Sequence, residues 1–381
     1  MRKYFLLIIG LLMAASFMGS VLAKSGQQVI EKRKNPIRDS EKTTDEVFKN
    51  IKVMNGQPAS QLVPAMHFFE AALGFNCGNC HVRGSGEHDW DFAKDDKPEK
   101  RRTREMMTMM NAINKESFKG EQLVTCFTCH KGSPDPTAIP ALMTASSMKE
   151  KNNKPDEEEV IKIPNRLGTA EEIISTYQQA IGGKEAFEKI TSLKLEGKAD
   201  MGNGRESSVS VFEKAPNLYF SETKSPQGTM QRVFNGEAGW FKSQQFQRKF
   251  EGDDLRDLKL SSDFYAPLNF TKNYSDLKLE NVQLLDNDTV YAIEGTFSKY
   301  RRFEFFFDTK SGLLLRQIQY SHTLFGDLQI QTDYKDYRNV DGVLFPFELD
   351  ISDYEHAQKF RYDAITPNAA VDDKIFEEPG K

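Results

Sequence analysis

All four cysteines of this chain fall into two copies of one pentapeptide pattern. The copies are CGNCH at 77–81 and CFTCH at 126–130, within 381 residues. Two thiols three residues apart on a helical turn match the two vinyl groups of a porphyrin, and the next histidine directs an imidazole at the iron. The pattern therefore predicts two covalently bound haem c groups, with these attachment cysteines and proximal iron ligands: Cys77, Cys80 and His81, then Cys126, Cys129 and His130.

Two other chemistries use paired cysteines. A zinc site made of four thiols needs its two pairs about 15 to 20 residues apart, whereas Cys77 and Cys126 are 49 residues apart. A thioredoxin-like dithiol needs a βαβ context, which the surrounding sequence lacks. Neither chemistry gives a role to His81 and His130, so we expect haem attachment.

The second axial ligand of each iron must come from elsewhere in the chain. A methionine sulfur favours ferrous iron and raises the potential, whereas a second imidazole lowers it. Met66 lies eleven residues before Cys77, and its alternative role is that of an ordinary core methionine. Its neighbour His67 points about 100° away on a helix. For the second haem, periodicity does not choose among Met106, Met107, Met109 and Met110.

A helix is predicted before each pentapeptide. Helical spacing gives the first helix the apolar face Leu62, Met66, Phe69 and Leu73. Gly74 is placed to end it. The same reasoning gives the second helix the face Met106, Met109, Met110 and Ile113. We therefore predict an internal duplication of helix, turn and pentapeptide with a period of 49 residues, counted from Cys77 to Cys126.

The stretch from about Val47 to Pro136 resembles the photosynthetic reaction-centre cytochrome c subunit family. The resemblance rests on ALGFNCGNCH (72–81), RRTREMMTMMNAIN (101–114) and VTCFTCHKGSPDP (124–136). It implies distal methionine ligands at Met66 and at Met106, with Met109 as the rival for the second. The reaction-centre members carry four haems and dock on a photosynthetic complex, whereas this chain has two motifs. The resemblance therefore implies haem binding and electron transfer, but not photosynthesis.

Some further polar side chains could serve the haems or a metal. The arginines at the start of the second helix suit haem propionates by charge, and equally suit a solvated helix face: Arg101, Arg102 and Arg104. His322 and His356 have no partners at ligand spacing, so we expect no metal site there.

The N-terminus has the pattern of a secretory signal. Arg2 and Lys3 precede an apolar stretch from Phe5 to Met18, and Val21-Leu22-Ala23 supplies a cleavage site. We predict a signal peptide over 1–23 and a periplasmic protein; an uncleaved membrane anchor is the alternative, although the apolar run is shorter than the roughly 20 residues of a span. The net charge of -5 gives no reason to expect nucleic acid as a partner.

The chain is predicted to be an α+β protein of two domains. A flexible lead-in (24–44) precedes a small, mostly helical dihaem domain (45–147), and a polar linker (148–168) follows. Residues 169–381 begin with one or two helices and continue with period-two alternation, as in Phe303, Phe305 and Phe307, which is typical of antiparallel strands. Asp341-Gly342 is a hairpin signal.

This second half resembles the LolA/LolB-like fold of outer-membrane lipoprotein sorting. The resemblance rests on AIGGKEAFEKITSLKLEG (180–197), FNGEAGW (234–240), FDTKSGLLLRQ (307–317) and YRNVDGVLFPFEL (337–349). It implies a strongly curved antiparallel sheet, a half-barrel whose concave apolar face can hold acyl chains under a helical lid.

The leading functional hypothesis is single-electron transfer between redox proteins of the periplasm or the inner-membrane surface, without enzymatic activity. One alternative is a haem enzyme of the dihaem peroxidase type, with one iron left five-coordinate. Another is a lipid- or lipoprotein-binding module in which the haems sense redox state or stabilise the small domain.

Overall fold

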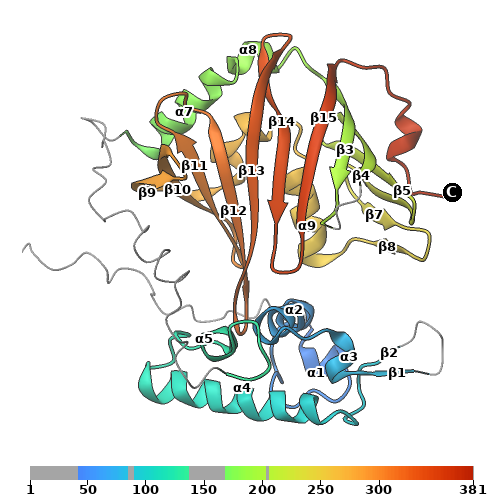
Figure 1. Cartoon of the computed structure of the whole chain (residues 1–381), viewed down its shortest axis with the longest axis vertical. Helices are drawn as coiled ribbons and strands as arrows, with labels where there is room; N and C mark the ends of the chain where they lie inside the picture. Colours follow the sequence, from blue (N-terminus) through green and yellow to red (C-terminus); the bar gives the residue numbers. More distant parts are fainter. Residues whose placement is uncertain (1–41, 85–89, 137–167, 203–205, 381) are drawn as a thin grey trace, which may run out of the picture.

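The computed structural model describes residues 42–84, 90–136, 168–202 and 206–380. The signal peptide predicted over 1–23 lies outside the described residues, as do nearly all of the lead-in and of the linker. Figure 1 shows a helical part at one end and a large sheet at the other. No helix in the described ranges is long and apolar enough to cross a bilayer.

The helical part carries both pentapeptides. Its elements are α1 (Thr44–Val47), η1 (Ala59–Gln61), α2 (Leu62–Leu73), α3 (Cys77–Cys80), β1 (Val82–Arg83), β2 (Trp90–Asp91), α4 (Pro98–Ser117) and α5 (Cys126–His130). The predicted helix before the first pentapeptide is confirmed as α2. It ends at Gly74, whose φ of 64° is the left-handed conformation that glycine adopts without strain.

The predicted apolar face of the second helix is confirmed only at Met110. On α4 the buried side chains are Met107, Met110 and Asn114, whereas Met109 is 48% exposed. Both sets repeat at helical spacing, and a run of four methionines marks no single face. Contacts with the rest of the helical core determine which face of α4 is buried, and the spacing of residues along one helix does not reveal these contacts.

The predicted large antiparallel sheet is confirmed. It has 13 strands in the order β8-β7-β6-β5-β4-β3-β15-β14-β13-β12-β11-β10-β9, and it is not closed, since β8 and β9 do not pair with each other. Its strands are β3 (Ser192–Asp200), β4 (Glu206–Lys214), β5 (Leu218–Ser225), β6 (Gly228–Asn235), β7 (Gly239–Lys242), β8 (Gln247–Lys249), β9 (Ser275–Leu285), β10 (Asp288–Ser298), β11 (Arg301–Asp308), β12 (Leu314–Thr323), β13 (Gly326–Val340), β14 (Val343–Ser352) and β15 (Ala357–Pro367). Asp341 and Gly342, with φ of 52° and 88°, form the predicted hairpin turn between β13 and β14.

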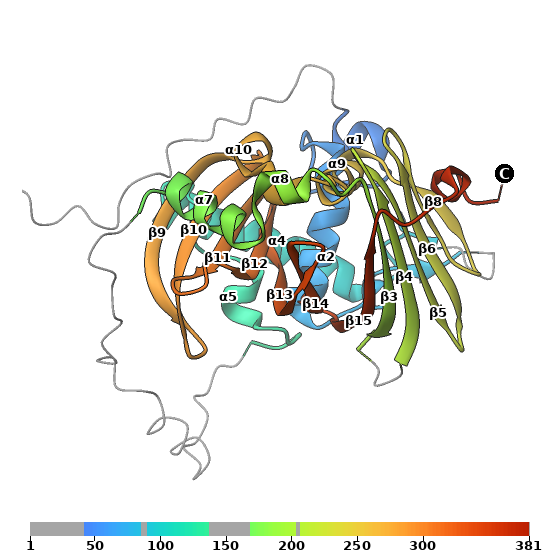
Figure 2. The same cartoon turned by 90° about the horizontal axis from the view of Figure 1, so that it is seen from above.

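The sheet curves around four short helices rather than the one or two predicted (Figure 2). These are α7 (Ala170–Ala180), α8 (Gly183–Phe187), α9 (Gly252–Ser261) and α10 (Phe270–Asn273), with 3-10 turns η2 (Ala266–Leu268) and η3 (Asp373–Phe376). The sequence predicts the first two but not α9 and α10, because each of these is short and lies within the region of alternating strands.

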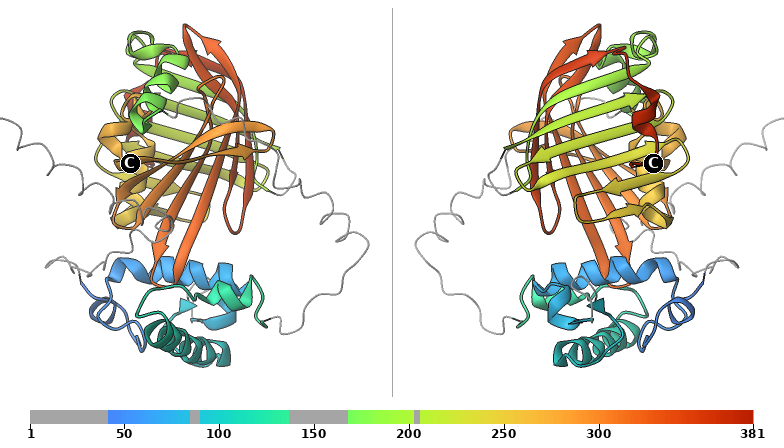
Figure 3. Two further views of the ribbon diagram at one scale, coloured as in Figure 1. Left: turned by 90° about the vertical axis from the view of Figure 1, so that its left-hand side faces the viewer. Right: turned by 90° about the vertical axis from the view of Figure 1, so that its right-hand side faces the viewer.

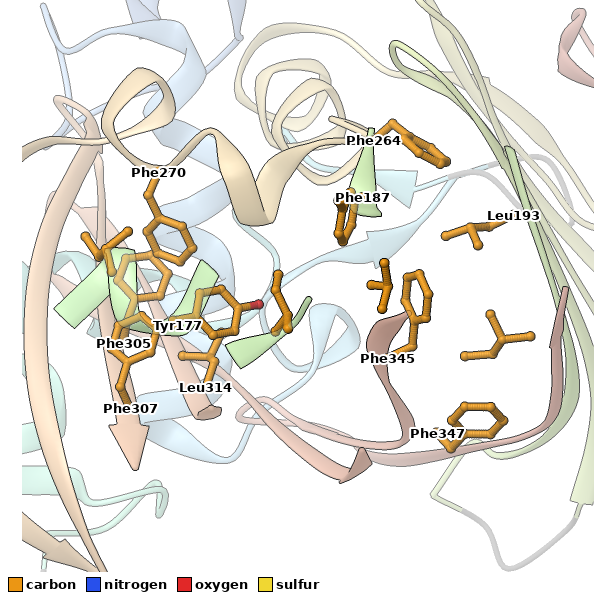
Figure 4. Close-up of a cluster of buried hydrophobic side chains, with 14 of the residues drawn as sticks. Tyr177, Phe187, Leu193, Phe264, Phe270, Phe305, Phe307, Leu314, Phe345 and Phe347 are labelled. Atoms are coloured by element: carbon orange, nitrogen blue, oxygen red, sulfur yellow. The ribbon is translucent and has the colours of Figure 1, made fainter. Parts of the chain in front are cut away.

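Helices and strands share one aromatic core on the inner face of the sheet (Figure 4). One face of α7 is buried, with Ile174 and Tyr177 exposing 2% and 6% of their surface. Tyr177 contacts Phe307 of β11 and Phe270 of α10, with ring centroids 5.3 and 5.9 Å apart. The alternating strand pattern thus results from burial against these helices.

Candidate functional site

The first pentapeptide forms one helical turn, α3, whose start is capped by two side-chain hydrogen bonds. Asn76 is its N-cap, and the Asn76 Oδ1 accepts a hydrogen bond from the Gly78 amide at 2.9 Å. Asn79 accepts one from the Asn76 amide, also at 2.9 Å. This capping box fixes the turn, and the three-residue spacing then places the Cys77 and Cys80 thiols on one side of it.

The second pentapeptide forms the same turn, α5, through a different pair of side chains. The Thr125 amide donates to the Thr128 hydroxyl at 3.0 Å, in the positions that Asn76 and Asn79 occupy in the first copy. Lys131 ends the turn with a left-handed φ of 51°. The predicted duplication therefore extends to the capping of each turn, although the residues differ.

The two imidazoles are held in different ways. Nδ1 of His130 lies 3.0 Å from the Ser133 backbone carbonyl, and because a carbonyl only accepts, Nδ1 must carry the proton. This leaves the Nε2 lone pair of His130 free for a metal. Burial lowers the pKa of His81, and the Lys100 charge lowers it further, while the Phe92 carbonyl opposes the shift. His81 is therefore neutral near pH 7, the form that binds iron.

All four thiols are free. Burial raises the pKa of Cys77 and Cys80, and it raises the pKa of Cys126 to about 11. In the described ranges the cysteines do not gather with one another or with histidine and carboxylate side chains into a group that could hold a metal ion. The thiols are thus present as two separate pairs, each beside its own histidine.

Each pentapeptide packs against the helix of the other copy. The Gly132 amide, just after the second pentapeptide, donates to the Ala72 carbonyl of α2 at 2.9 Å. Gly74 approaches the Gly132 carbonyl so closely that a Cβ on Gly74 would overlap it. In turn, the Cys80 thiol lies beside Glu99 and Thr103 of α4. The two copies are therefore interlocked within one helical part, not stacked one after the other.

The methionines predicted as distal ligands lie in different surroundings. Met66 is half-buried and packs against the helical core, defined here as Met54, Ala65, Phe68, Phe69, Ala72, Leu73, Met107, Met110 and Phe325. Met66 is one turn before Glu70, whose carboxylate accepts a hydrogen bond from the Cys77 thiol at 3.2 Å. This face of α2 is therefore turned toward the first pentapeptide.

On α4, Met107 and Met110 belong to the helical core, and Met109 is exposed. Met106 is half-buried and is not part of that core. Helical spacing alone does not choose a ligand among the four methionines of α4. Met106 is the one that neither belongs to the helical core nor is exposed to solvent.

The arginines of α4 are engaged differently from one another. Arg104 is half-buried and donates to the Asp95 carboxylate at 2.8 Å and to the Asn50 carbonyl at 3.0 Å. Arg102 is exposed and pairs with Glu105 at 3.1 Å, and Arg101 donates to the Asp95 carbonyl at 2.7 Å. Arg104 therefore has a structural role, and Arg101 and Arg102 lie on the solvated side of the helix.

Two positioning residues are not apparent from the sequence. Asn114 is 6% exposed and bonds both backbone groups of Val124, two residues before Cys126. Glu70 bonds the Cys77 thiol and, at 3.1 Å, His67. Asn114 follows Met107 and Met110 at helical spacing, so a polar residue on a buried face is the signal that could have found it.

The surroundings of the pentapeptides fit a flat apolar group. Six of the ten large apolar side chains that are exposed in the described ranges lie between residues 47 and 127, among them Val63, Phe92 and Phe127. A cavity of ≈ 340 Å³ lies beside His81, and Arg83 covers the face of Trp90 at its wall. Paired free thiols, an imidazole beside each pair and exposed apolar side chains are what covalent haem attachment needs, so the residues fit haem c.

The two histidines of the sheet lie at hairpin turns. His322 Nδ1 is 2.8 Å from Asp327, and His356 Nδ1 is 3.5 Å from Asp353. His356 Nδ1 also lies 3.9 Å from the Glu355 carboxylate, but in the described ranges neither histidine belongs to a group of side chains that could hold a metal ion.

Comparison with known proteins confirms the family resemblance of the helical part. Residues 13–170 match the family model of the photosynthetic reaction centre cytochrome C subunit. The matched range includes α2, α4 and both pentapeptides. No curated protein matches the chain.

The solved structures similar to this chain include a LolA superfamily protein from Nitrosomonas europaea. It has 15% identity over 56% of this chain and 99% of that chain, with a TM-score of 0.38. A DUF1329 family protein from Desulfovibrio piger has 12% identity over 55% of this chain and 98% of that chain, with a TM-score of 0.41.

Proposed function

Starting from the match of residues 13–170 to the reaction centre cytochrome C subunit family, we propose that this chain is a periplasmic dihaem c-type cytochrome that transfers single electrons. In this proposal Cys77 and Cys80 bind one haem c through thioether bonds and Cys126 and Cys129 bind the other. His81 and His130 are the proximal iron ligands. Bound haem supplies a one-electron iron couple.

The observation that carries the proposal is the repeated turn. Two separate segments form the same capped helical turn, each with two free thiols on one side and an imidazole next to it. A single turn of this kind would also suit a redox dithiol. Two such turns, which use every cysteine of the chain and place a histidine after each pair, fit haem attachment better than a zinc site or a dithiol.

Met66 and Met106 are proposed as the distal ligands. Met66 lies on the face of α2 that is turned toward Cys77, and Met106 lies on α4 outside the helical core. With histidine and methionine on both irons there is no open coordination position. The chain then exchanges electrons with redox protein partners and does not bind a substrate at iron.

The interlocked arrangement supports a relay. Each pentapeptide packs against the helix of the other copy. Both haems would therefore be bound in the same helical part, and an electron would cross only a short distance between them. A role for the sheet in binding lipid or lipoprotein is the weaker alternative. Side chains of α7, α8 and α10 fill part of its inner face, which leaves less apolar surface for an acyl chain.

The test is a pyridine haemochrome assay with mass spectrometry on the full chain, made with the cytochrome c maturation machinery. We expect two covalent haems per chain; fewer than two would overturn the proposal. The spectrum of the oxidised protein then separates carrier from enzyme. A weak methionine-to-iron charge-transfer band without a high-spin signal supports the carrier, and a high-spin signal supports the peroxidase alternative.

A further inference from the structure

One hairpin of the sheet reaches into the helical part. It is formed by β12 and β13 and turns at Leu324 and Phe325 (Figure 1). The turn is closed within itself: the Thr323 hydroxyl donates to the Gly326 carbonyl at 2.7 Å and accepts from the Phe325 amide at 3.2 Å. Figure 3 shows the end of this hairpin against the helices from two opposite sides.

Phe325 is part of the helical core although it belongs to the sheet. It is 3% exposed, and its ring lies 4.8 Å from the ring of Phe69 on α2. The same cluster contains Met107 and Met110 of α4. The phenylalanine therefore packs on α2, the helix that carries Met66, within a cluster that also contains two buried methionines of α4, the helix that carries Met106.

Neighbouring contacts hold the hairpin in place. The Gln122 side chain, in the segment between α4 and α5, donates to the Leu324 carbonyl at 2.5 Å. Gly326 lies so close to the Phe68 ring that a side chain there would overlap it. The turn thus fits between α2 and the segment that leads into the second pentapeptide.

A second hairpin contacts α2 on another face. The Tyr354 hydroxyl, in the turn between β14 and β15, lies 2.9 Å from Nδ1 of His67. His67 in turn bonds Glu70, which accepts from the Cys77 thiol. The sheet therefore meets α2 both at its buried aromatic face and at its exposed side.

From these contacts we infer that Phe325 is a positioning residue for the haem irons: its packing on α2, within the helical core that α2 shares with α4, sets where the distal methionines stand. This inference rests on the proposed function. An iron–sulfur bond needs its donor within a few tenths of an ångström, and a side chain holds such a position only when its helix is locked by packing. Removing a buried ring leaves a cavity into which helices shift.

The test compares Phe325→Ala and the milder Phe325→Leu with Phe306→Ala in the full chain. Phe306 is a matched control, because it is 4% exposed and lies in a separate cluster within the sheet with Val290 and Ala292. Three quantities are measured: covalent haems per chain, the methionine-to-iron charge-transfer band with the midpoint potential, and amide hydrogen exchange over 62–73.

We expect Phe325→Ala to keep two haems per chain, to weaken the charge-transfer band and to lower the midpoint potential. Exchange over 62–73 should become roughly tenfold faster. Phe325→Leu should lie in between, and Phe306→Ala should leave the band, the potential and this exchange unchanged.

An unchanged band, potential and exchange in Phe325→Ala would overturn the inference, as would equal effects of Phe306→Ala. The proposed function fails separately, if the unsubstituted chain carries no covalent haem. In that case the exchange comparison between Phe325→Ala and Phe306→Ala still decides whether the hairpin holds α2, because exchange is measured without any haem signal.

Discussion

Asn114 and Val124, ten positions apart in the chain, are joined by two hydrogen bonds. The Asn114 Nδ2 donates to the Val124 carbonyl at 2.7 Å, and the Asn114 Oδ1 accepts from the Val124 amide at 2.9 Å. A side-chain amide thus pairs with a backbone residue as a neighbouring strand would. It brings the start of the second pentapeptide back against α4.

Replacing Asn114 should therefore destabilise the helical part. Asn114→Ala removes both bonds and leaves two backbone groups of Val124 without a partner, which costs about 2–4 kcal/mol. Urea unfolding followed by circular dichroism measures the change. Asn111→Ala, on the exposed side of the same helix, is the control and should change stability by less than about 0.5 kcal/mol. Equal losses of stability at the two positions would contradict the proposal that Asn114 holds the segment at Val124 against α4.

Because Gly74 lies so close to Gly132, we expect Gly74→Ala to destabilise the protein more than Gly56→Ala. Gly74 and Gly56 both have a left-handed φ, of 64° and 71°. A Cβ at Gly56 meets nothing within 4 Å, whereas at Gly74 it overlaps the Gly132 carbonyl. Gly56→Ala should cost about 1 kcal/mol for the conformation alone, and Gly74→Ala about 1–3 kcal/mol more for the overlap. Denaturant unfolding of both variants checks this, and a cost at Gly74 no larger than that at Gly56 would show that α2 and the second pentapeptide do not pack as described.

Met106 and Met109 offer a direct test of the second distal ligand. Met106→Ala should abolish about half of the methionine-to-iron charge-transfer band and create a high-spin signal, since one of two irons loses its sulfur. Met109→Ala removes an exposed side chain and should leave the spectrum unchanged. Absorption and electron paramagnetic resonance spectra of the oxidised proteins make the comparison. The reverse result would assign the ligand to Met109.

Glu213 predicts a pH dependence of stability in the sheet. It shares a face of β4 with the buried Val209 and Val211, and burial raises its pKa to about 7. The folded state therefore holds a proton that the unfolded state has already released. Stability falls as the pH rises from about 4.5 to 7 and stays reduced above that, by about 1–3 kcal/mol.

Glu213→Gln should remove this penalty. The variant should unfold at the same denaturant concentration as the original protein near pH 4.5, and at a higher one above pH 7. Glu237→Gln, at an exposed turn position, is the control and should follow the original protein across the range. A constant difference between Glu213→Gln and the original protein at all pH values would rule out the titration of Glu213 as its cause.

The helical turn at each pentapeptide could be predicted from the sequence because it is local. Two thiols and a histidine within five residues need only one helical turn to come together, and Asn76 and Thr125 supply the cap for that turn. The strands after residue 190 could also be predicted from the sequence, because burial of one face of a sheet appears as alternation of apolar and polar residues along the chain.

Only the tertiary structure decided which face of α4 is buried, that each pentapeptide packs on the helix of the other copy, and that Phe325 lies in the helical core. These depend on contacts between residues far apart in the chain, such as Phe69 and Phe325, and a run of methionines fits more than one face. Local spacing determines what a segment can bind; packing between distant segments determines where that segment stands and which of several equivalent side chains is left free to bind.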